Sequence, residues 1–331
     1  VVDGPEADTA GEVREASVAA QGEVIRRRGV PAAWLERCRA ALKHCLAPAD
    51  TGGEWTLRWA AVHAADISDD ELLEAVRRRA SPRAEPSAPV RFASMYRLWE
   101  WCSGPGTAAT PEQASTVGRT LGGTLRDKRQ HEFCRAAAAL ALCACPKTLA
   151  TAGTIPDARD LTAHPLLLAS VALLRTHPQE TVETGVETGC GVERVRGVLL
   201  GVAATEGGGA GRRPGALQAV LALGKLRHES KLPALLGPMD HLAVCEMLVR
   251  TVRVMMMRQG SSDSPLSAET CSALNTVLEG ARVELLEPVE RAQKRLESDF
   301  AAHLPARLRS HASSLLSSLL SCLDTPAEES A

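Results

Sequence analysis

Residues 131–146 read HEFCRAAAALALCACP, an almost unbroken run of alanine and leucine that carries one histidine and three cysteines. Alanine and leucine are strong helix formers, and small side chains let neighbouring helices approach one another closely. Free cysteine is itself among the most frequently buried residue types. The stretch therefore predicts a helix that is buried on nearly all sides and is stopped by Pro146.

A metal or thiol site is the alternative interpretation of His131, Cys134, Cys143 and Cys145. On a helix, Cys134 and Cys145 share a face but lie about 16 Å apart along the axis, and Cys143 points to the opposite side. One zinc ion needs all of its ligands within about 2.0–2.3 Å, so an intact helix cannot use them together. A Cys-x-Cys pair with a distant ligand such as Cys190, and a redox-sensitive thiol, remain as alternatives to packing.

The overall composition also favours helices. The 331 residues are 45% apolar and 24% charged, and only 3% are aromatic. Sheet-rich domains are usually richer in aromatic and β-branched side chains, so we expect an all-α protein. Ten cysteines scattered through apolar helical stretches are typical of reduced thiols, which predicts a cytoplasmic or nuclear location.

The net charge and the hydropathy of the sequence argue against nucleic acid and membranes as partners. The formal net charge is −2, so no global basic field attracts nucleic acid or an acidic membrane. No apolar run reaches the roughly 18 residues of a membrane-spanning helix, and the acidic start has no signal-peptide pattern. The chain begins with Val1 rather than Met, which indicates a fragment or a processed product.

Helical periodicity alternates with short Gly, Pro and Ser-rich breaks along the chain, which predicts about 13 to 15 helices. Neighbouring helices joined by short loops are expected to pack antiparallel. From the breaks we predict four parts: helical pairs in 1–80, a Pro/Gly-rich connection with one helix in 81–110, further helical repeats in 111–323, and a flexible tail in 324–331.

Two local patterns make testable structural predictions. Trp34, Cys38, Leu42 and Cys45 form a stripe at helical spacing, which predicts that all four lie in the core. Ser68 and Glu71 have the spacing of a capping box, which predicts that Ser68 caps the helix that follows.

Three stretches resemble the helices of HEAT repeats, the helix-pair units of HEAT and armadillo-like α-solenoid proteins. They are VREASVAAQGEVI at 13–25, LRWAAVHAADISDDELLEAV at 57–76 and FCRAAAALALCAC at 133–145. The resemblance implies an α-solenoid of stacked antiparallel helix pairs with irregular repeats. A compact helical bundle is the alternative architecture.

The sequence has no signature of a particular reaction. No nucleophile elbow is present, and the glycine-rich loop at 206–215 lacks the Gly-Lys-Ser/Thr ending of a phosphate-binding loop. We therefore predict no catalytic residue, no cofactor and no metal. The expected function is a non-enzymatic scaffold or adaptor that binds a protein partner, as a fragment or subunit of a larger complex. The alternatives are a helical non-catalytic region of an enzyme, an enzyme cofactor subunit, or an RNA-associated repeat.

Candidate contacts for a partner come from two kinds of sequence feature. Short basic clusters fall at expected helix ends, where they complement the helix dipole or contact an anionic partner. A run of three methionines provides adaptable apolar surface, because Met side chains are flexible and polarisable. The candidate contacts are Arg26, Arg27, Arg28, Arg77, Arg78, Arg79, Met255, Met256 and Met257.

Overall fold

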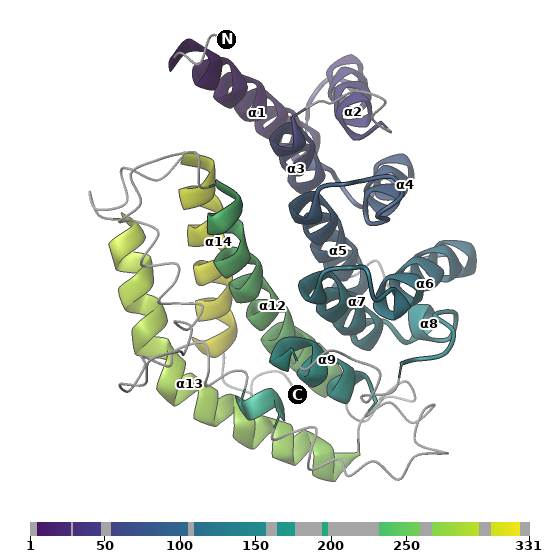
Figure 1. The fold of residues 1–331 in the computed structure, drawn as a ribbon, viewed down its shortest axis with the longest axis vertical. Helices are drawn as coiled ribbons and strands as arrows, with labels where there is room; N and C mark the ends of the chain where they lie inside the picture. The colour runs from purple at the N-terminus through teal and green to yellow at the C-terminus, as the bar shows by residue number, and fades with distance from the viewer. Residues whose placement is uncertain are drawn as a thin grey trace. The chain divides into compact units, whose positions relative to one another are not determined.

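The computed structural model describes residues 5–27, 29–47, 54–104, 109–156, 164–175, 194–197, 232–258, 267–297 and 306–324. Every regular element in these ranges is a helix, and they contain no strand (Figure 1). The prediction of an all-α protein is confirmed. The chain divides into two compact units, Val1–Ile155 and Pro156–Ala331.

The helices of the first unit are arranged in two rows (Figure 1). In one row, α1, α3, α5 and α7 pack against each other in chain order. The even-numbered helices lie beside this row, with α2 against α3, α4 against α5, and α6 against α7. The bounds are α1 Pro5–Arg26, α2 Ala32–Leu46, α3 Trp55–Ala64, α4 Asp70–Arg79, α5 Ala88–Ser103, α6 Pro111–Arg126, α7 Glu132–Ala144 and α8 Pro146–Leu149.

Helix α7 is the alanine-rich stretch that the sequence analysis singled out, and every residue from Phe133 to Ala144 is buried. His131 caps its N-terminus, because the imidazole Nδ1 accepts a hydrogen bond from the Phe133 N–H at 3.3 Å. Pro146 follows α7 and begins the short helix α8, a position where its missing N–H costs no hydrogen bond. The prediction of a buried, packed helix is confirmed.

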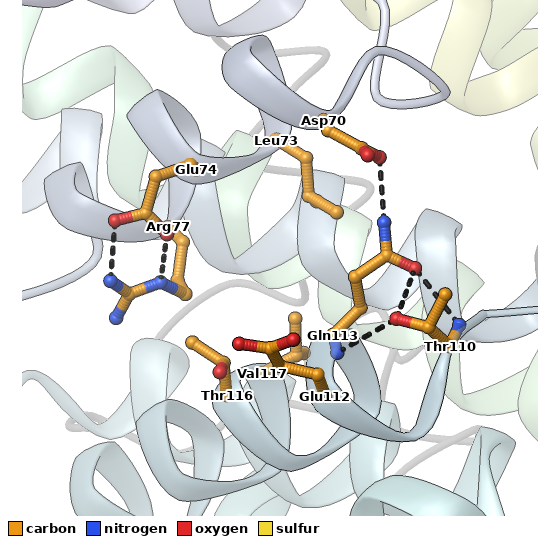
Figure 2. Close-up of a pocket in the computed structure, with 9 residues that line it drawn as sticks. All are labelled: Asp70, Leu73, Glu74, Arg77, Thr110, Glu112, Gln113, Thr116 and Val117. Atoms are coloured by element: carbon orange, nitrogen blue, oxygen red, sulfur yellow. Dashed lines mark hydrogen bonds and ion pairs between the residues drawn. The ribbon is translucent and has the colours of Figure 1, made fainter.

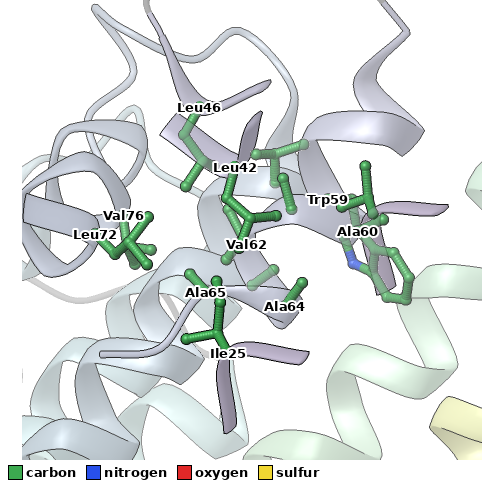
Figure 3. Close-up of a cluster of buried hydrophobic side chains, with 14 of the residues drawn as sticks. Ile25, Leu42, Leu46, Trp59, Ala60, Val62, Ala64, Ala65, Leu72 and Val76 are labelled. Carbon is green, nitrogen blue, oxygen red and sulfur yellow. The ribbon is translucent and has the colours of Figure 1, made fainter. Parts of the chain in front are cut away.

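A first hydrophobic cluster joins α1 to α4 (Figure 3). Leu42, Val62 and Leu72 are completely buried in it. The predicted stripe on α2 is only partly correct, because Trp34 is 59% exposed and Cys45 is half-buried. The buried residues Cys38, Leu42 and Leu46 follow i, i+4, i+8 spacing, so the buried face centres on Leu42 and Trp34 lies about 80° from that centre.

The predicted cap of α4 is also wrong. Asp69, not Ser68, is the N-cap residue, and its carboxylate accepts from the N–H groups of Glu71 at 3.0 Å and Leu72 at 3.1 Å. The Ser68 hydroxyl instead donates to Asp66 at 2.7 Å. Ser and Asp are comparable caps, so the side chain nearest the first helical turn takes the position.

The stretch 81–110, predicted to be a connection with one helix, contains α5. This helix packs against α3, α4 and α7, and most of its residues are buried, including the large side chains Trp99 and Met95. The helices before and after this stretch therefore belong to one packed unit.

The second unit contains α9 Pro165–Leu174, α12 Leu232–Met257, α13 Ala268–Glu297 and α14 Ala306–Asp324. Helix α14 packs against both α12 and α13, and α12 also contacts α9. The interior of the second unit contains Leu242, Val249, Leu285 and Leu316, all completely buried. The unit therefore has an apolar core of its own.

Candidate partner-binding grooves

A groove of about 430 Å³ runs between α4 and α6 on the even-numbered row of the first unit (Figure 2). Residues of both helices and of the turn before α6 line it: Asp70, Leu73, Glu74, Arg77, Thr110, Glu112, Gln113, Thr116 and Val117. Leu73 and Val117 are almost fully buried, so the groove has an apolar floor between polar walls.

One end of the groove is closed by a hydrogen-bonded bridge. Thr110 caps α6 in a capping box, in which its hydroxyl accepts from the Gln113 N–H at 3.3 Å and its N–H donates to the Gln113 side chain at 2.9 Å. The amide nitrogen of Gln113 then donates to Asp70 on α4 at 2.6 Å. The N-terminal ends of the two helices are thus held together.

At the other end of the groove, Arg77 on α4 forms a hydrogen bond with α6. Its guanidinium donates twice to the Glu74 carboxylate, at 2.6 and 2.7 Å, and once to the Thr120 hydroxyl on α6 at 3.0 Å. The hydrogen bond from Arg77 is the main cause of a lowered pKa of Glu74, so this carboxylate is ionised at neutral pH. Among the described residues that line the groove, three carboxylates, those of Asp70, Glu74 and Glu112, accompany one cation, that of Arg77, so this lining is acidic.

A second, more polar groove of about 460 Å³ lies between α2 and α4. It is lined by Glu36, Arg39, Lys43, Ser68, Asp69, Asp70 and Glu71. Ion pairs cross it, from Arg39 to Asp69 at 3.0 Å and from Lys43 to Glu71. Asp70 lines both grooves, so the two lie next to each other along the same row of helices.

The predicted basic contacts lie in different surroundings. Arg26 and Arg27 are exposed at the end of α1 and both pair with Glu23, at 3.6 and 3.4 Å. Arg28 lies outside the described residues. Arg78 is exposed and pairs with Glu74 at 2.8 Å. At each of these two helix ends, two arginines share one carboxylate of their own helix, which offsets part of their positive charge.

Arg79 is buried and offers no surface to a partner. It is 1% exposed and donates to the Glu85 carboxylate at 3.0 Å and to the Leu46 carbonyl at 3.1 Å. Arg58 also binds Glu85 through two hydrogen bonds, at 2.9 and 3.0 Å. Sequence reasoning missed this ionic cluster, because Glu85 lies in a proline-rich break that is 27 residues from Arg58 and has no pattern of its own.

The three consecutive methionines on α12 differ in exposure, because successive residues of a helix point in directions about 100° apart. Met255 is completely buried, Met256 is half-buried and Met257 is 55% exposed. Only Met257 therefore presents most of its side chain to solvent.

No model of a protein family matches the chain, and no curated protein is significantly similar to it. Among the described residues, no three His, Cys, Asp or Glu side chains lie close enough together to hold a metal ion. No helix in the same part of the chain is both long and apolar enough to cross a bilayer.

Proposed function

We propose that the chain is a non-enzymatic helical-repeat scaffold whose first unit is an α-solenoid segment that binds a protein partner. The observation that carries this proposal is the pair of open grooves between successive helices of one row, α2, α4 and α6. In solenoids, each repeat contacts its neighbours and leaves an extended surface for binding. The packing of α1, α3, α5 and α7 in chain order and the HEAT-like stretches support the same architecture.

The chemistry of the α4/α6 groove favours a particular class of partner. Its walls carry an excess of carboxylates and its floor is formed by Leu73 and Val117. A protein segment with lysine or arginine beside an apolar side chain complements both features, because charge complementarity guides association and an apolar anchor contributes affinity. A partner of this kind would lie across α4 and α6.

The charge distribution gives less support to an RNA-binding repeat. That function would use the basic clusters of α1 and α4 as one stripe. The guanidinium groups of Arg26, Arg27, Arg77 and Arg78 are paired with Glu23 or Glu74, and Arg79 is buried. Paired cations neutralise fewer phosphates, and phosphate neutralisation supplies most of the affinity for nucleic acid.

Site-specific photocrosslinking in cells tests the proposal. A photoreactive amino acid at position 116, which lines the groove, is compared with the same amino acid at position 276, an exposed threonine on α13. We expect one protein to crosslink at position 116 and not at position 276. The same adducts at both positions, or none at position 116, would contradict groove binding.

Charge reversal provides the matched variants for the captured partner. Glu112 and Glu269 are both exposed and both lie in the first turn of a helix, but only Glu112 lines the groove. We expect Glu112→Lys to weaken binding about tenfold, which corresponds to about 1.4 kcal/mol, and Glu269→Lys to leave it unchanged. Equal losses in the two variants would assign the effect to overall charge or to the helix N-terminus.

A further inference from the structure

The turn after α4 presents a serine and a proline outside the residues that line the two grooves. The carbonyl of Ser81 accepts hydrogen bonds from the N–H groups of Ala84 at 3.1 Å and Glu85 at 3.0 Å. Ser81 is partly exposed, and the next two residues, Pro82 and Arg83, are exposed. Because the side chain of Glu85 is buried, the turn is anchored at its end while the serine and the proline lie at the surface.

Among the described residues, two hydroxyl side chains directly precede a proline, those of Ser81 and Thr110. The Thr110 hydroxyl belongs to the capping box of α6, where it accepts from the Gln113 N–H at 3.3 Å and donates to the Gln113 side-chain oxygen at 3.2 Å. The Ser81 hydroxyl accepts one hydrogen bond, from the Arg83 N–H at 3.3 Å, and donates none within the part of the chain that the structure describes. Modification of Ser81 therefore disrupts fewer contacts than modification of Thr110.

The charges near the two hydroxyls also differ. Arg78 precedes Ser81 by three residues, and its side chain is 60% exposed beside its ion pair with Glu74. The exposed Arg83 forms no ion pair with any residue that the structure describes. Thr110 instead lines the acidic α4/α6 groove. A phosphate group carries a charge of about −1.5 to −2 at pH 7, so it is stabilised on Ser81 and repelled on Thr110.

We propose that Ser81 is a phosphorylation site for a protein kinase that selects serine followed by proline. The kinase transfers the terminal phosphoryl group of ATP to this hydroxyl. The Ser81 Oγ forms a bond to the γ-phosphorus, and the bond from that phosphorus to the oxygen that bridges it to the β-phosphate breaks. ADP leaves with the bridging oxygen, and the hydroxyl proton passes to a base of the kinase.

The fold favours recognition of the proline over recognition of the arginines. The stretch RRRASP at 77–82 also places arginines before the serine, and such charge patterns are a second feature that kinases select. However, Arg79 is 1% exposed and its guanidinium binds Glu85 and the Leu46 carbonyl, so a kinase that reads Arg79 has to break the buried ionic cluster. Pro82 is exposed and has no N–H, so its recognition breaks no backbone hydrogen bond from that residue.

Phosphorylation of the purified full chain tests the proposal. The folded protein and a synthetic peptide of residues 75–100 are each incubated with ATP and either a proline-selective or an arginine-selective kinase. A protease that cleaves after glutamate, but not before proline, places Ser81 in the peptide 75–100 and Thr110 in the peptide 101–112, and fragmentation in a mass spectrometer locates the phosphate. We expect the proline-selective kinase to modify Ser81 in both the protein and the peptide. The arginine-selective kinase should modify Ser81 in the peptide alone.

A matched pair of variants separates Ser81 from another serine of the same peptide. Ser87 lies in the same proline-rich break, its side chain forms no capping hydrogen bond, and it is followed by alanine. We expect Ser81→Ala to abolish phosphorylation of the peptide 75–100 by the proline-selective kinase and Ser87→Ala to leave it unchanged.

Two results with the wild-type chain would overturn the proposal. In one, the proline-selective kinase modifies Ser81 in the synthetic peptide but not in the folded protein. In the other, it modifies Ser81 of the folded protein no faster than Thr110. Neither result depends on the folding of a variant or on the binding of a partner to the grooves.

Discussion

At the scale of single residues, Glu85 is the side chain whose loss we expect to reduce the stability of the first unit most. It is completely buried, and its carboxylate accepts hydrogen bonds from Arg58, from Arg79 and from the Ser87 N–H at 3.0 Å. Burial is the main cause of a lowered pKa of Arg79, and the nearby Glu85 carboxylate opposes that effect. Because Arg79 also binds the Leu46 carbonyl at the end of α2, this cluster connects α2, α3, α4 and the turn before α5.

Replacing Glu85 with alanine is expected to destabilise the first unit strongly. The substitution leaves two guanidinium groups buried without their carboxylate, which costs about 3–5 kcal/mol when one member of a buried ion pair is removed. The control is Glu74→Ala, which removes the partner of the more exposed Arg77 and Arg78 and should cost at most about 1 kcal/mol. Urea denaturation measures both, and similar losses of unfolding free energy would show that the buried cluster has no special role.

At the scale of elements, the C-terminal ends of α6 and α3, which have no glycine cap, accept hydrogen bonds from arginine side chains of neighbouring helices. Arg135 on α7 donates to the Leu125 carbonyl of α6 at 3.0 Å, and Arg26 on α1 donates to the Ala64 carbonyl of α3 at 3.4 Å. The last carbonyls of a helix have no partner within the helix and carry its negative partial charge. These arginines therefore stabilise the helix ends and connect successive helices.

Close packing between α6 and the chain around α8 depends on two glycines of α6. A Cβ atom on Gly118 would lie 2.2 Å from the Thr148 carbonyl oxygen, and one on Gly122 would lie 1.9 Å from the Ala152 carbonyl oxygen. Both distances are far shorter than van der Waals contact. The two segments can thus approach this closely only because neither position carries a side chain.

Neighbouring glycines of α6 should respond to alanine in opposite directions. Gly122→Ala must displace backbone and is expected to destabilise the first unit by about 1–3 kcal/mol. A Cβ atom on Gly123 meets nothing within 4 Å, so Gly123→Ala should stabilise the helix by about 0.5–1 kcal/mol. The unfolding free energies of the two variants provide the comparison, and a stabilising Gly122→Ala would be incompatible with the close approach.

At the scale of the whole molecule, the chain has two units with separate cores. The second unit contains two histidines that the fold keeps neutral. Burial, followed by the nearby His164, lowers the pKa of His241 to about 4, and burial lowers the pKa of His311 to about 4. Both values lie below the ordinary 6.5, so the unfolded state binds these protons more readily than the folded state.

The stability of the second unit should therefore depend on pH. The contribution of these histidines is fully present above about pH 6.5 and is lost as the pH falls through that value toward about 4. Between pH 6.5 and 5, each histidine removes at most about 2 kcal/mol, since one pKa unit corresponds to about 1.4 kcal/mol. Urea denaturation at the two pH values measures the loss, which should be smaller in His311→Gln. An equal loss in the variant and the wild-type chain would exclude His311 as a source.

Local patterns predicted the helices well and the individual side-chain positions less well. The buried helix after His131 follows from a run of alanine and leucine, which are strong helix formers with small or apolar side chains. The exposure of Trp34 could not be predicted, because a stripe at helical spacing does not show where the neighbouring helix centres its contact. The capping residue of α4 was equally ambiguous, since Ser68 and Asp69 have similar capping ability.

The amino-acid sequence by itself determined that this protein is built from helices and that the alanine-rich helix after His131 is buried. Periodicity, helix propensity and the positions of proline and glycine act over a few residues, so they can be read without knowledge of the fold. The tertiary structure alone decided the partners of Glu85 and the grooves beside α4. Each of these joins residues that lie far apart in the chain, and helices with the same local pattern can pack in several ways that bring different side chains together.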